Sequence, residues 1–564
     1  MTKQIAYTSG KLIVNEFGNG FVNQDNKSIY ISKKDLNRAY NNEIVDLEYY
    51  QDDDQKYYGK VINYSLVGKS FIGNVHHTFK KIIYITVSEL TQLITIDTTK
   101  SNNKLFVPKN SWVYIKITEE LDNSINGTII EILKSDVDEL IEKKFNLAQI
   151  PNNIIQPQTL PQHQHIDQTN LDTFTIDPIT CNDCDDAFSI QPIPDTNLLN
   201  IYVHISDVAH YINPSIGSEF DKIINQGNTY YGSNKNWTMI PREYADNHCS
   251  ILPNKETKVV TTHFIFNSQT KELEYQKWFY STIISKHKYH YDLVDEIFES
   301  NNDFLILYET SQIIKKTIPD IILNYESRSH EMIKYWMLKT NQVMSKEINL
   351  LYRSNPEPTQ NSLKMISDYF KFTNLVTIIP NTITREDIIN LTTQQNTKFT
   401  SFMIKNILQK AYYTETNEFH YGIGIFDYTH WTSPIRRAVD LLNHCILKGY
   451  DINVSQYLEN INNADYKQNQ IEIFIQEFNN NHKVVLNQEL DAVIIGLNPI
   501  GGVIYVNDLD YKYSIHISRM ANEKLVYNKE LNQLKGELTN FKLFDNIKVK
   551  VSKINMNMIE FTII

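Results

Sequence analysis

The segment FTIDPITCNDCDDA, residues 174–187, holds four aspartates within ten positions, namely Asp177, Asp183, Asp185 and Asp186. Residues 187–190 can form a strand directly after them, and residues 198–205 can return antiparallel beyond a turn at 194–197. The aspartates are therefore expected in a loop at the end of a buried sheet. Like charges repel strongly there, so the arrangement is tolerable if cations neutralise it.

Oxygen ligands packed at this density favour a site for Mg²⁺ or Mn²⁺. Two such ions roughly 3.5–4 Å apart can activate a water and stabilise the leaving oxygen of a phosphodiester. The alternative to a metal site is an ordinary acidic turn exposed to solvent. An EF-hand is excluded because, counting from Asp183, Phe188 stands where the loop needs Gly and Pro194 where it needs Glu.

The same segment also contains a Cys181-x-x-Cys184 pair. A zinc site of the usual kind would need a second ligand pair, and neither Cys249 nor Cys445 belongs to one. The carboxylate interpretation is therefore preferred.

Composition describes an ordinary globular chain of several domains. At 564 residues three or four domains are expected, with 41% hydrophobic and 21% charged residues. No apolar run reaches the roughly 18–20 residues of a membrane span, and the first residues contain no secretory signal. The four cysteines are too few for a disulfide scaffold, so the expected location is the cytoplasm, with the nucleus as the alternative. A net charge of −12 argues against a protein that coats nucleic acid generally, but not against a local basic channel.

The chain divides by its pattern of strands and helices. Residues 1–75 and 76–150 contain short strands with Gly and Asn punctuation, which predict two small β-barrels. Residues 171–450 mix strands with long helices, for example at 331–348 and 434–447, and 486–564 are again strand-rich and predict a third barrel.

Between these parts lie two connecting segments. Residues 151–170 are rich in Pro, Gln and Asn and are expected to be a linker, with His163 and His165 in solvent. Residues 457–480 are amphipathic and predict a connecting helix.

The stretch Thr432-Ser-Pro-Ile-Arg436-Arg437 has the form of a helix start. Ser433 is a good N-cap and Pro434 suits the first helical position. A helix N-terminus with two arginines in its first turn is a ready phosphate site. The alternative for Arg436 is a surface ion pair with Asp440, four residues on.

Five landmarks in this order resemble the ribonuclease II/ribonuclease R (RNB) family, which includes the hydrolytic subunit of the eukaryotic exosome. The family block I-D-P-x-x-x-x-D-x-D-D-A is matched position for position at 176–187. The further landmarks are VHISDV at 203–208, MIP and CSILP within 239–253, the helix at 332–341, and HYGI with YTHWTSPIRRAVDL within 420–441. Three positions depart from the family pattern, namely Ser233, Lys288 and Ala438.

The resemblance implies a multidomain fold: an α+β RNB catalytic domain flanked by two N-terminal cold-shock-like OB-fold β-barrels and one C-terminal OB-fold RNA-binding domain. It implies 3′→5′ hydrolysis of single-stranded RNA to nucleoside 5′-monophosphates with magnesium. By position, Asp177, Asp183, Asp185 and Asp186 would hold the metal, and Asp185 would be the residue that catalysis can least spare. With Arg436 and Arg437, Asp185 makes up the expected catalytic set.

Tyr231 and Tyr291 stand where the family places base-clamping tyrosines, although packing explains most of the 35 tyrosines in this chain. The expected partner is single-stranded RNA, with no membrane and a monomeric state. The alternative function is a catalytically inactive RNA-binding protein on the same scaffold, and a DNA exonuclease is a third. An inactive relative would have no reason to keep four mutually repelling carboxylates.

Overall fold

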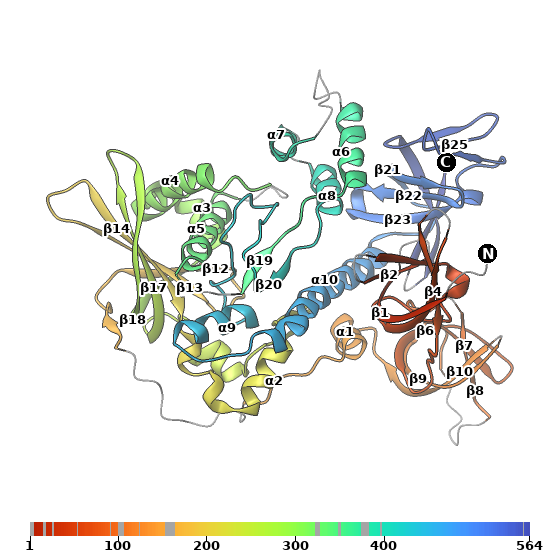
Figure 1. Cartoon of the computed structure of the whole chain (residues 1–564), viewed down its shortest axis with the longest axis horizontal. Coiled ribbons are helices and arrows are strands. Elements are labelled where there is room, and N and C mark those ends of the chain that lie inside the picture. Colours follow the sequence, from red (N-terminus) through yellow and green to blue (C-terminus); the bar gives the residue numbers. More distant parts are fainter. Residues whose placement is uncertain are drawn as a thin grey trace. The chain divides into compact units, whose positions relative to one another are not determined.

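The computed structural model describes residues 5–564 except 15–18, 25–26, 53–54, 91, 100–106, 123, 153–163, 322–326, 348–350, 374–382, 395–396 and 556–557. The chain forms two compact units (Figure 1). One comprises residues 1–147, 232–234 and 472–564, and the other comprises 148–231 and 235–471. Among the described helices, none is long and apolar enough to cross a membrane.

Two closed five-stranded barrels open the first unit. The first has the order β1-β2-β3-β5-β4, and the second has the order β10-β8-β7-β6-β9. Alternate strand residues point inward and fill each barrel with aliphatic side chains such as Leu12, Leu47, Ile85 and Ile115, all fully buried. The strand bounds are β1 Ala6–Val14, β2 Gly20–Gln24, β3 Lys27–Ile31, β4 Ile44–Gln51, β5 Tyr57–Ile62, β6 Ser70–Phe79, β7 Ile82–Thr86, β8 Ile94–Asp97, β9 Trp112–Leu121 and β10 Ser124–Leu133.

The end of the first unit is a five-stranded antiparallel sheet of order β23-β22-β21-β27-β28, with a small sheet of β24, β25 and β26 beside it. Its edge strands β23 and β28 contact each other, so the sheet curls round one apolar core. The predicted barrels at both ends of the chain are therefore confirmed. The bounds are β21 Glu489–Asn498, β22 Gly501–Val506, β23 Tyr511–His516, β24 Val526–Asn528, β25 Gln533–Lys535, β26 Asn540–Lys542, β27 Asn546–Asn555 and β28 Met558–Ile563.

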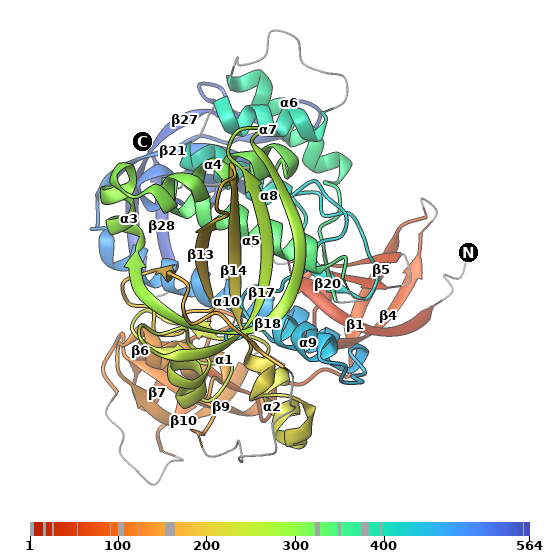
Figure 2. The same ribbon diagram turned by 90° about the vertical axis from the view of Figure 1, so that its left-hand side faces the viewer.

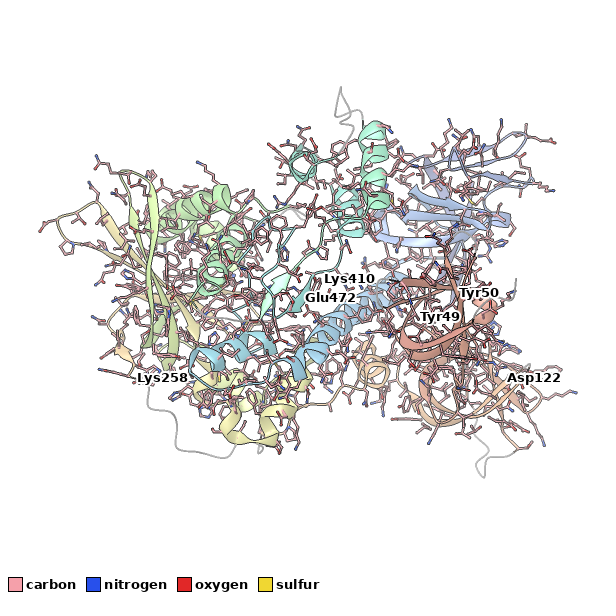
Figure 3. All side chains as sticks on the ribbon, viewed as in Figure 1. Tyr49, Tyr50, Asp122, Lys258, Lys410 and Glu472 are labelled. Atoms are coloured by element: carbon pink, nitrogen blue, oxygen red, sulfur yellow. The ribbon has the colours of Figure 1, made fainter. Side chains whose placement is uncertain are left out.

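Tyrosines gather on the first barrel, and Figure 3 labels Tyr49 and Tyr50 on β4. The Tyr50 ring stacks on Tyr58 with centroids 5.9 Å apart, and Tyr49 meets Tyr57 edge to face at 6.1 Å. These rings are half-buried, so part of each faces solvent.

The second unit is built on one sheet of order β11-β18-β12-β13-β14-β17, which closes on itself because β18 also pairs with β17 (Figure 2). The long strand β18 runs parallel to β12, and the other long pairings are antiparallel. The predicted hairpin after the aspartates is confirmed, with β13 and β14 in register from Asp186–Ile205 to Pro192–Leu199. The bounds are β11 Ile166–Asp167, β12 Thr173–Asp177, β13 Asp186–Pro192, β14 Leu198–Ser206, β17 Glu256–Asn267 and β18 Glu272–His290.

Helices α3, α4 and α5 lie beside this sheet in Figures 1 and 2, and their apolar side chains join its core. Phe188 and Phe264 from the sheet meet Trp336 of α5 edge to face. Asn301 caps α4 by accepting from the N–H groups of Asp303 and Phe304. The helix bounds in this unit are α2 Ser218–Gln226, α3 Tyr291–Ile297, α4 Asn302–Thr317, α5 Arg328–Met344, α6 Gln360–Thr373, α7 Arg385–Gln394, α8 Lys398–Ile407 and α9 Ala438–Leu447.

Two further helices and two short hairpins belong to the described chain. Helix α1, Val137–Phe145, follows the second barrel, and α10, Ser455–Lys483, is the connecting helix predicted at 457–480. Two short hairpins pair β15 Tyr230–Tyr231 with β16 Asn236–Trp237, and β19 Tyr352–Ser354 with β20 Tyr412–Thr414. The helix predicted at 331–348 is α5, which begins three residues earlier; Ile348 lies outside the described residues.

Candidate active site

The parallel pairing of β12 with β18 brings Asp177 next to the start of α3. Asp177 is the last residue of β12 and lies opposite His290, the last residue of β18. Tyr291 follows as the first residue of α3, and the His290 side chain caps that helix by accepting from the Leu293 N–H at 3.2 Å. Because parallel strands end at the same edge of a sheet, the first aspartate and the second predicted clamp tyrosine share one edge.

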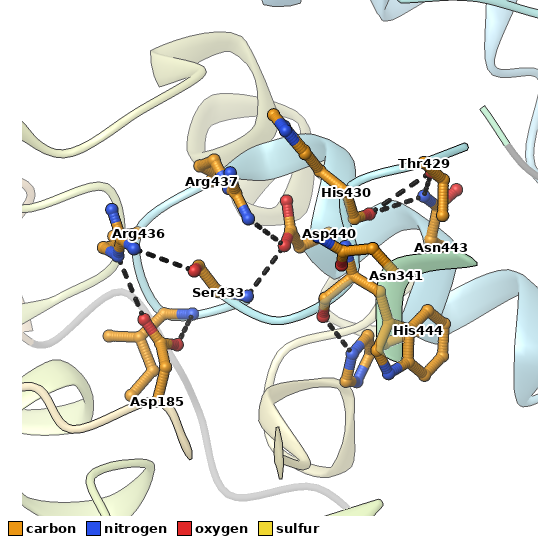
Figure 4. A network of polar contacts seen from close by, with 12 residues as sticks. Asp185, Asn341, Thr429, His430, Ser433, Arg436, Arg437, Asp440, Asn443 and His444 are labelled. Carbon is orange, nitrogen blue, oxygen red and sulfur yellow. Dashed lines mark hydrogen bonds and ion pairs between the residues drawn. The ribbon is translucent and has the colours of Figure 1, made fainter. Parts of the chain in front are cut away.

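Asp185 is held by a segment 250 residues further along the chain (Figure 4). Its Oδ1 accepts from the Ile435 N–H at 2.9 Å, and its Oδ2 accepts from Arg436 Nε at 3.3 Å. Its backbone carbonyl accepts from the Ser206 N–H at 2.8 Å, which ties it to the end of β14. The carboxylate is therefore fixed in position from both sides.

Burial dominates the electrostatics of the four aspartates. Asp177 and Asp185 are buried, and Asp183 and Asp186 are half-buried. Burial raises the pKa of all four, and raises the pKa of Asp185 to about 8 although Arg436 and the Ile435 N–H oppose it. The carboxylates of Asp177 and Asp185 raise the pKa of Asp186 further. Such a cluster is costly without positive charge to balance it.

The donor set fits a divalent cation. Oδ2 of Asp177 and Oδ2 of Asp186 are buried and accept no hydrogen bond from the described residues. Buried carboxylate oxygens are normally paired, so two unpaired ones in one cluster are suited to coordinate a cation. Oxygen donors of this kind are the preferred ligands of Mg²⁺ and Mn²⁺.

Arg436 and Arg437 contact different carboxylates. Besides Asp185, Arg436 contacts Ser433, with Nη2 2.9 Å from Oγ, and its side chain is 44% exposed. Arg437 instead donates to Asp440 at 2.8 Å, and Asp440 is fully buried and also accepts from the Ser433 N–H at 2.7 Å. The alternative ion pair between Arg436 and Asp440 is absent, because Arg437 takes that place.

The helix predicted from Pro434 begins only at Ala438. The N–H groups of Ser433 and Ile435 go to the carboxylates of Asp440 and Asp185. The Ala438 N–H donates to the Gly227 carbonyl at 2.8 Å. These long-range partners outcompete the local helical pattern, so the arginines lie in a turn before the helix and not in its first turn.

The two candidate base-clamping tyrosines lie within the electrostatic field of the cluster. Burial raises the pKa of Tyr231, with Asp183 and Asp185 adding to the shift and Arg436 opposing it. Burial also raises the pKa of Tyr291, together with Asp186 and Asp177. The Tyr291 ring stacks on His330 with centroids 3.8 Å apart.

The roles of several residues that hold this site in place were not predicted from the sequence. Asp440 was considered only as a surface partner, yet its i,i+3 spacing from Arg437 could have suggested the pair that forms. Lys288 donates to the Cys181 carbonyl and so anchors the aspartate loop. No local sequence pattern predicts this contact, because the two residues are 107 positions apart. The stacking of His330 on Tyr291 likewise depends on the packing of α5 against α3.

The expectation that His165 is solvated is wrong, whereas His163 lies outside the described residues. Residues next to His165 form β11, which pairs with β18 and draws the imidazole inward. His165 Nε2 lies 3.6 Å from Asp207, its side chain is 8% exposed, and Lys448 Nζ lies 2.7 Å from the same carboxylate. Only residues 153–163 of the predicted linker are left undescribed.

Comparison with known proteins agrees with this geometry. The RNB domain model matches residues 165–451. Ribonuclease R of Chlamydia pneumoniae is 28% identical over 506 residues, which cover 76% of this chain and 73% of that protein. The structure of Mycoplasma genitalium RNase R in complex with ribose-methylated single-stranded RNA superposes with a TM-score of 0.83 at 20% identity, covering 99% and 100% of the two chains. Yeast Ssd1, described as a pseudonuclease, gives a TM-score of 0.72 at 16% identity over 94% of this chain and 81% of that one.

A closed sheet with buried aspartates at one edge and an arginine fixed on one of them defines an RNB-type nuclease, and the chain belongs to the RNB family. Its curated relatives are ribonucleases R, and it is a hydrolytic nuclease of that kind. The family is generally dependent on a divalent metal, which agrees with the orphaned carboxylate oxygens.

Proposed function

We propose that this chain hydrolyses single-stranded RNA from its 3′ end and releases nucleoside 5′-monophosphates with Mg²⁺ as the cofactor. The observation that carries the proposal is the contact of Asp185 with Arg436 and the Ile435 N–H, beside three further aspartates of which two have orphaned oxygens. These contacts support the proposal, because carboxylates suited to a cation lie beside an exposed guanidinium, and both can stabilise the charge that develops on a phosphodiester during hydrolysis.

Asp177, Asp183, Asp185 and Asp186 would hold the metal. When bound, Mg²⁺ supplies positive charge for the scissile phosphate and lowers the pKa of a coordinated water. Arg436 is oriented by Asp185 and Ser433, so its remaining N–H groups can donate to a phosphate oxygen. Arg437 acts indirectly. Its pairing with Asp440 fixes the turn that positions Ile435 and Arg436.

Tyr231 and Tyr291 would stack on bases near the 3′ end. Base–aromatic stacking is worth about 1–3 kcal/mol per base and tolerates any sequence, which suits an enzyme that degrades RNA without sequence preference. The tyrosines on the first barrel offer the same kind of platform, and contacts to the 2′-hydroxyl would select RNA over DNA. We further propose a monomer located in the cytoplasm, with the nucleus as the alternative.

The test uses a 5′-labelled oligo(A) with Mg²⁺ or EDTA, and compares the wild type with Asp185→Asn. We expect metal-dependent laddering from the 3′ end, slowed at least about 100-fold in the variant while RNA binding persists. Asp195→Asn, the same change in the exposed turn between β13 and β14, is the matched control and should leave the ladder unchanged.

The alternative is an inactive RNA-binding protein on the same scaffold, and the likeness to yeast Ssd1 gives it a concrete form. Binding without shortening in the wild type would establish that alternative. Degradation of an all-deoxy oligonucleotide at the same rate would instead indicate a nuclease without selection for RNA.

A further inference from the structure

The aspartate loop contains a second set of possible metal ligands, and two of them, Cys181 and Cys184, have no part in the hydrolytic reaction. Cys181, Cys184 and Asp177 each offer a ligand atom, and these atoms lie within 4.8 Å of one another. Neither Cys249 nor Cys445 supplies a second pair of ligands from outside the loop. Folding brings the third ligand from the end of β12, four residues before Cys181.

The distances suit tetrahedral coordination by sulfur and oxygen. Cys181 Sγ lies 3.7 Å from Asp177 Oδ1. Bond lengths of about 2.3 Å to sulfur and about 2.0 Å to oxygen at tetrahedral angles place two such ligand atoms about 3.5 Å apart. Small side-chain adjustments would therefore complete the site, with the fourth position left for water.

The loop is already held in this shape. The Cys181 N–H donates to the Pro178 carbonyl at 2.9 Å, and Lys288 donates to the Cys181 carbonyl. The Cys184 N–H donates to Ser250 Oγ at 3.0 Å. A site whose backbone is fixed before binding loses little freedom when the ion arrives.

The surroundings allow entry while excluding water from one side. Cys184 is fully buried against Ile251, Val259 and Ile283, whereas Cys181 is half-buried and gives a route from solvent. Soft sulfur ligands select Zn²⁺ and similar thiophilic ions, and Mg²⁺ does not compete for them.

We propose that Asp177, Cys181 and Cys184 bind a thiophilic divalent ion of the zinc type, each thiol giving up its proton on coordination. Because Asp177 also belongs to the magnesium cluster, occupation of this second site removes one carboxylate from that cluster. Zinc binding therefore stops RNA hydrolysis, and this last clause rests on the proposed function.

The binding test uses the full chain, kept reduced with a phosphine and freed of metal, and follows the sulfur-to-metal charge-transfer absorbance on titration with Cd²⁺. We expect one ion per chain and loss of the band in Cys181→Ser and in Cys184→Ser. Cys249→Ser and Cys445→Ser remove buried thiols of the same unit and should keep the band.

A band that persists in the double variant Cys181→Ser/Cys184→Ser, or the absence of a band in the wild type, would overturn the proposal. Circular dichroism verifies that each variant is folded, and the half-buried position of Cys181 makes its Ser variant the safer one. If a Ser variant is unfolded, alkylation of Cys181 in the wild type must abolish the band.

The inhibition arm adds Zn²⁺ to the RNA assay at constant Mg²⁺. Wild-type hydrolysis should fall as Zn²⁺ rises and recover when a chelator selective for zinc is added. The Cys181→Ser variant, compared with its own zinc-free rate, should resist. If no hydrolysis is seen under any condition, the proposed function fails while the absorbance titration still decides the metal site.

Discussion

Arg436 and Arg437 are adjacent in sequence, yet one guanidinium serves the aspartate cluster and the other serves the fold. We expect Arg436→Lys to lower kcat by about 10- to 100-fold with little change in stability, because an ammonium cannot donate to Asp185 and Ser433 in the same fixed geometry. Steady-state hydrolysis of oligo(A) together with urea unfolding measures both quantities.

Arg437→Ala should behave in the opposite sense. It leaves the fully buried Asp440 without its charged partner, so the free energy of unfolding should fall by about 3–5 kcal/mol. The two variants serve as controls for each other. Equal losses of activity at unchanged stability would contradict the separate roles assigned to the two arginines.

At the scale of the element, helix α2 ends at a glycine that packs against α10. Gly227 has φ of 80°, and a Cβ built there would lie 2.2 Å from Ala464 Cβ. Gly227→Ala should therefore destabilise the protein by well over about 1 kcal/mol, since both the backbone and the neighbouring helix must shift. Urea unfolding measures the loss.

Gly217→Ala, at the other end of α2, is the matched control. Gly217 also has a positive φ of 63°, but a Cβ there meets nothing within 4 Å. It should cost only the backbone penalty of roughly 1 kcal/mol. Similar costs for the two variants would mean that the contact with α10 is not tight.

Elements set by local pattern were predictable, and those set by distant partners were not. The hairpin β13–β14 follows from its alternating apolar residues and the turn near Asp195, and the structure has it where expected. The predicted start of α9 was wrong because the N–H groups of Ser433 and Ile435 donate to the carboxylates of Asp440 and Asp185. The aspartates themselves could be identified as a cluster, but the contact of Asp185 with Arg436 joins segments 251 residues apart, and no local pattern predicts it.

At the scale of the whole molecule, buried neutral histidines make stability sensitive to acid. His204 lies between Ser189 and Thr261 at 2.9 and 2.8 Å, and burial lowers its pKa to about 3. In the unfolded chain the His pKa is about 6.5, so this side chain is protonated at pH values at which the native His204 stays neutral. Its contribution is therefore complete above about pH 6.5 and is lost as the pH falls towards 3, by about 1.4 kcal/mol per pH unit.

This pH dependence is measured by comparing wild type with His204→Gln in urea at about pH 7.5 and pH 5.5, on either side of the unfolded pKa. The comparison with the variant is needed because Asp185 has the opposite effect on stability. Burial raises its pKa to about 8, so in metal-free protein its protonation adds stability as the pH falls. The variant should lose less stability on acidification. His516→Gln, on an exposed side chain, should follow the wild type, and identical slopes in all three proteins would refute the prediction.

Without a bound metal, the buried carboxylates of the aspartate cluster should lower the free energy of unfolding of the protein. In EDTA, Asp186→Asn should raise the free energy of unfolding by roughly 0.5–2 kcal/mol, since it removes one buried carboxylate whose Oδ2 has no partner among the described residues. In Mg²⁺ the wild type should gain about 2.7 kcal/mol at 100 times Kd, and the variant less. Calorimetric melting with and without Mg²⁺ tests this, and a wild type indifferent to Mg²⁺ would exclude the metal from the cluster.

The long chain separation between Asp185 and its partners also bears on synthesis at the ribosome. The two halves of the site are 250 residues apart, so a growing chain carries the aspartates long before it carries Arg436. At about 5–20 residues per second, the gap lasts about 10–50 s. During that interval the proposed hydrolytic centre is not yet assembled in the emerging polypeptide, so the chain cannot cleave the messenger that encodes it.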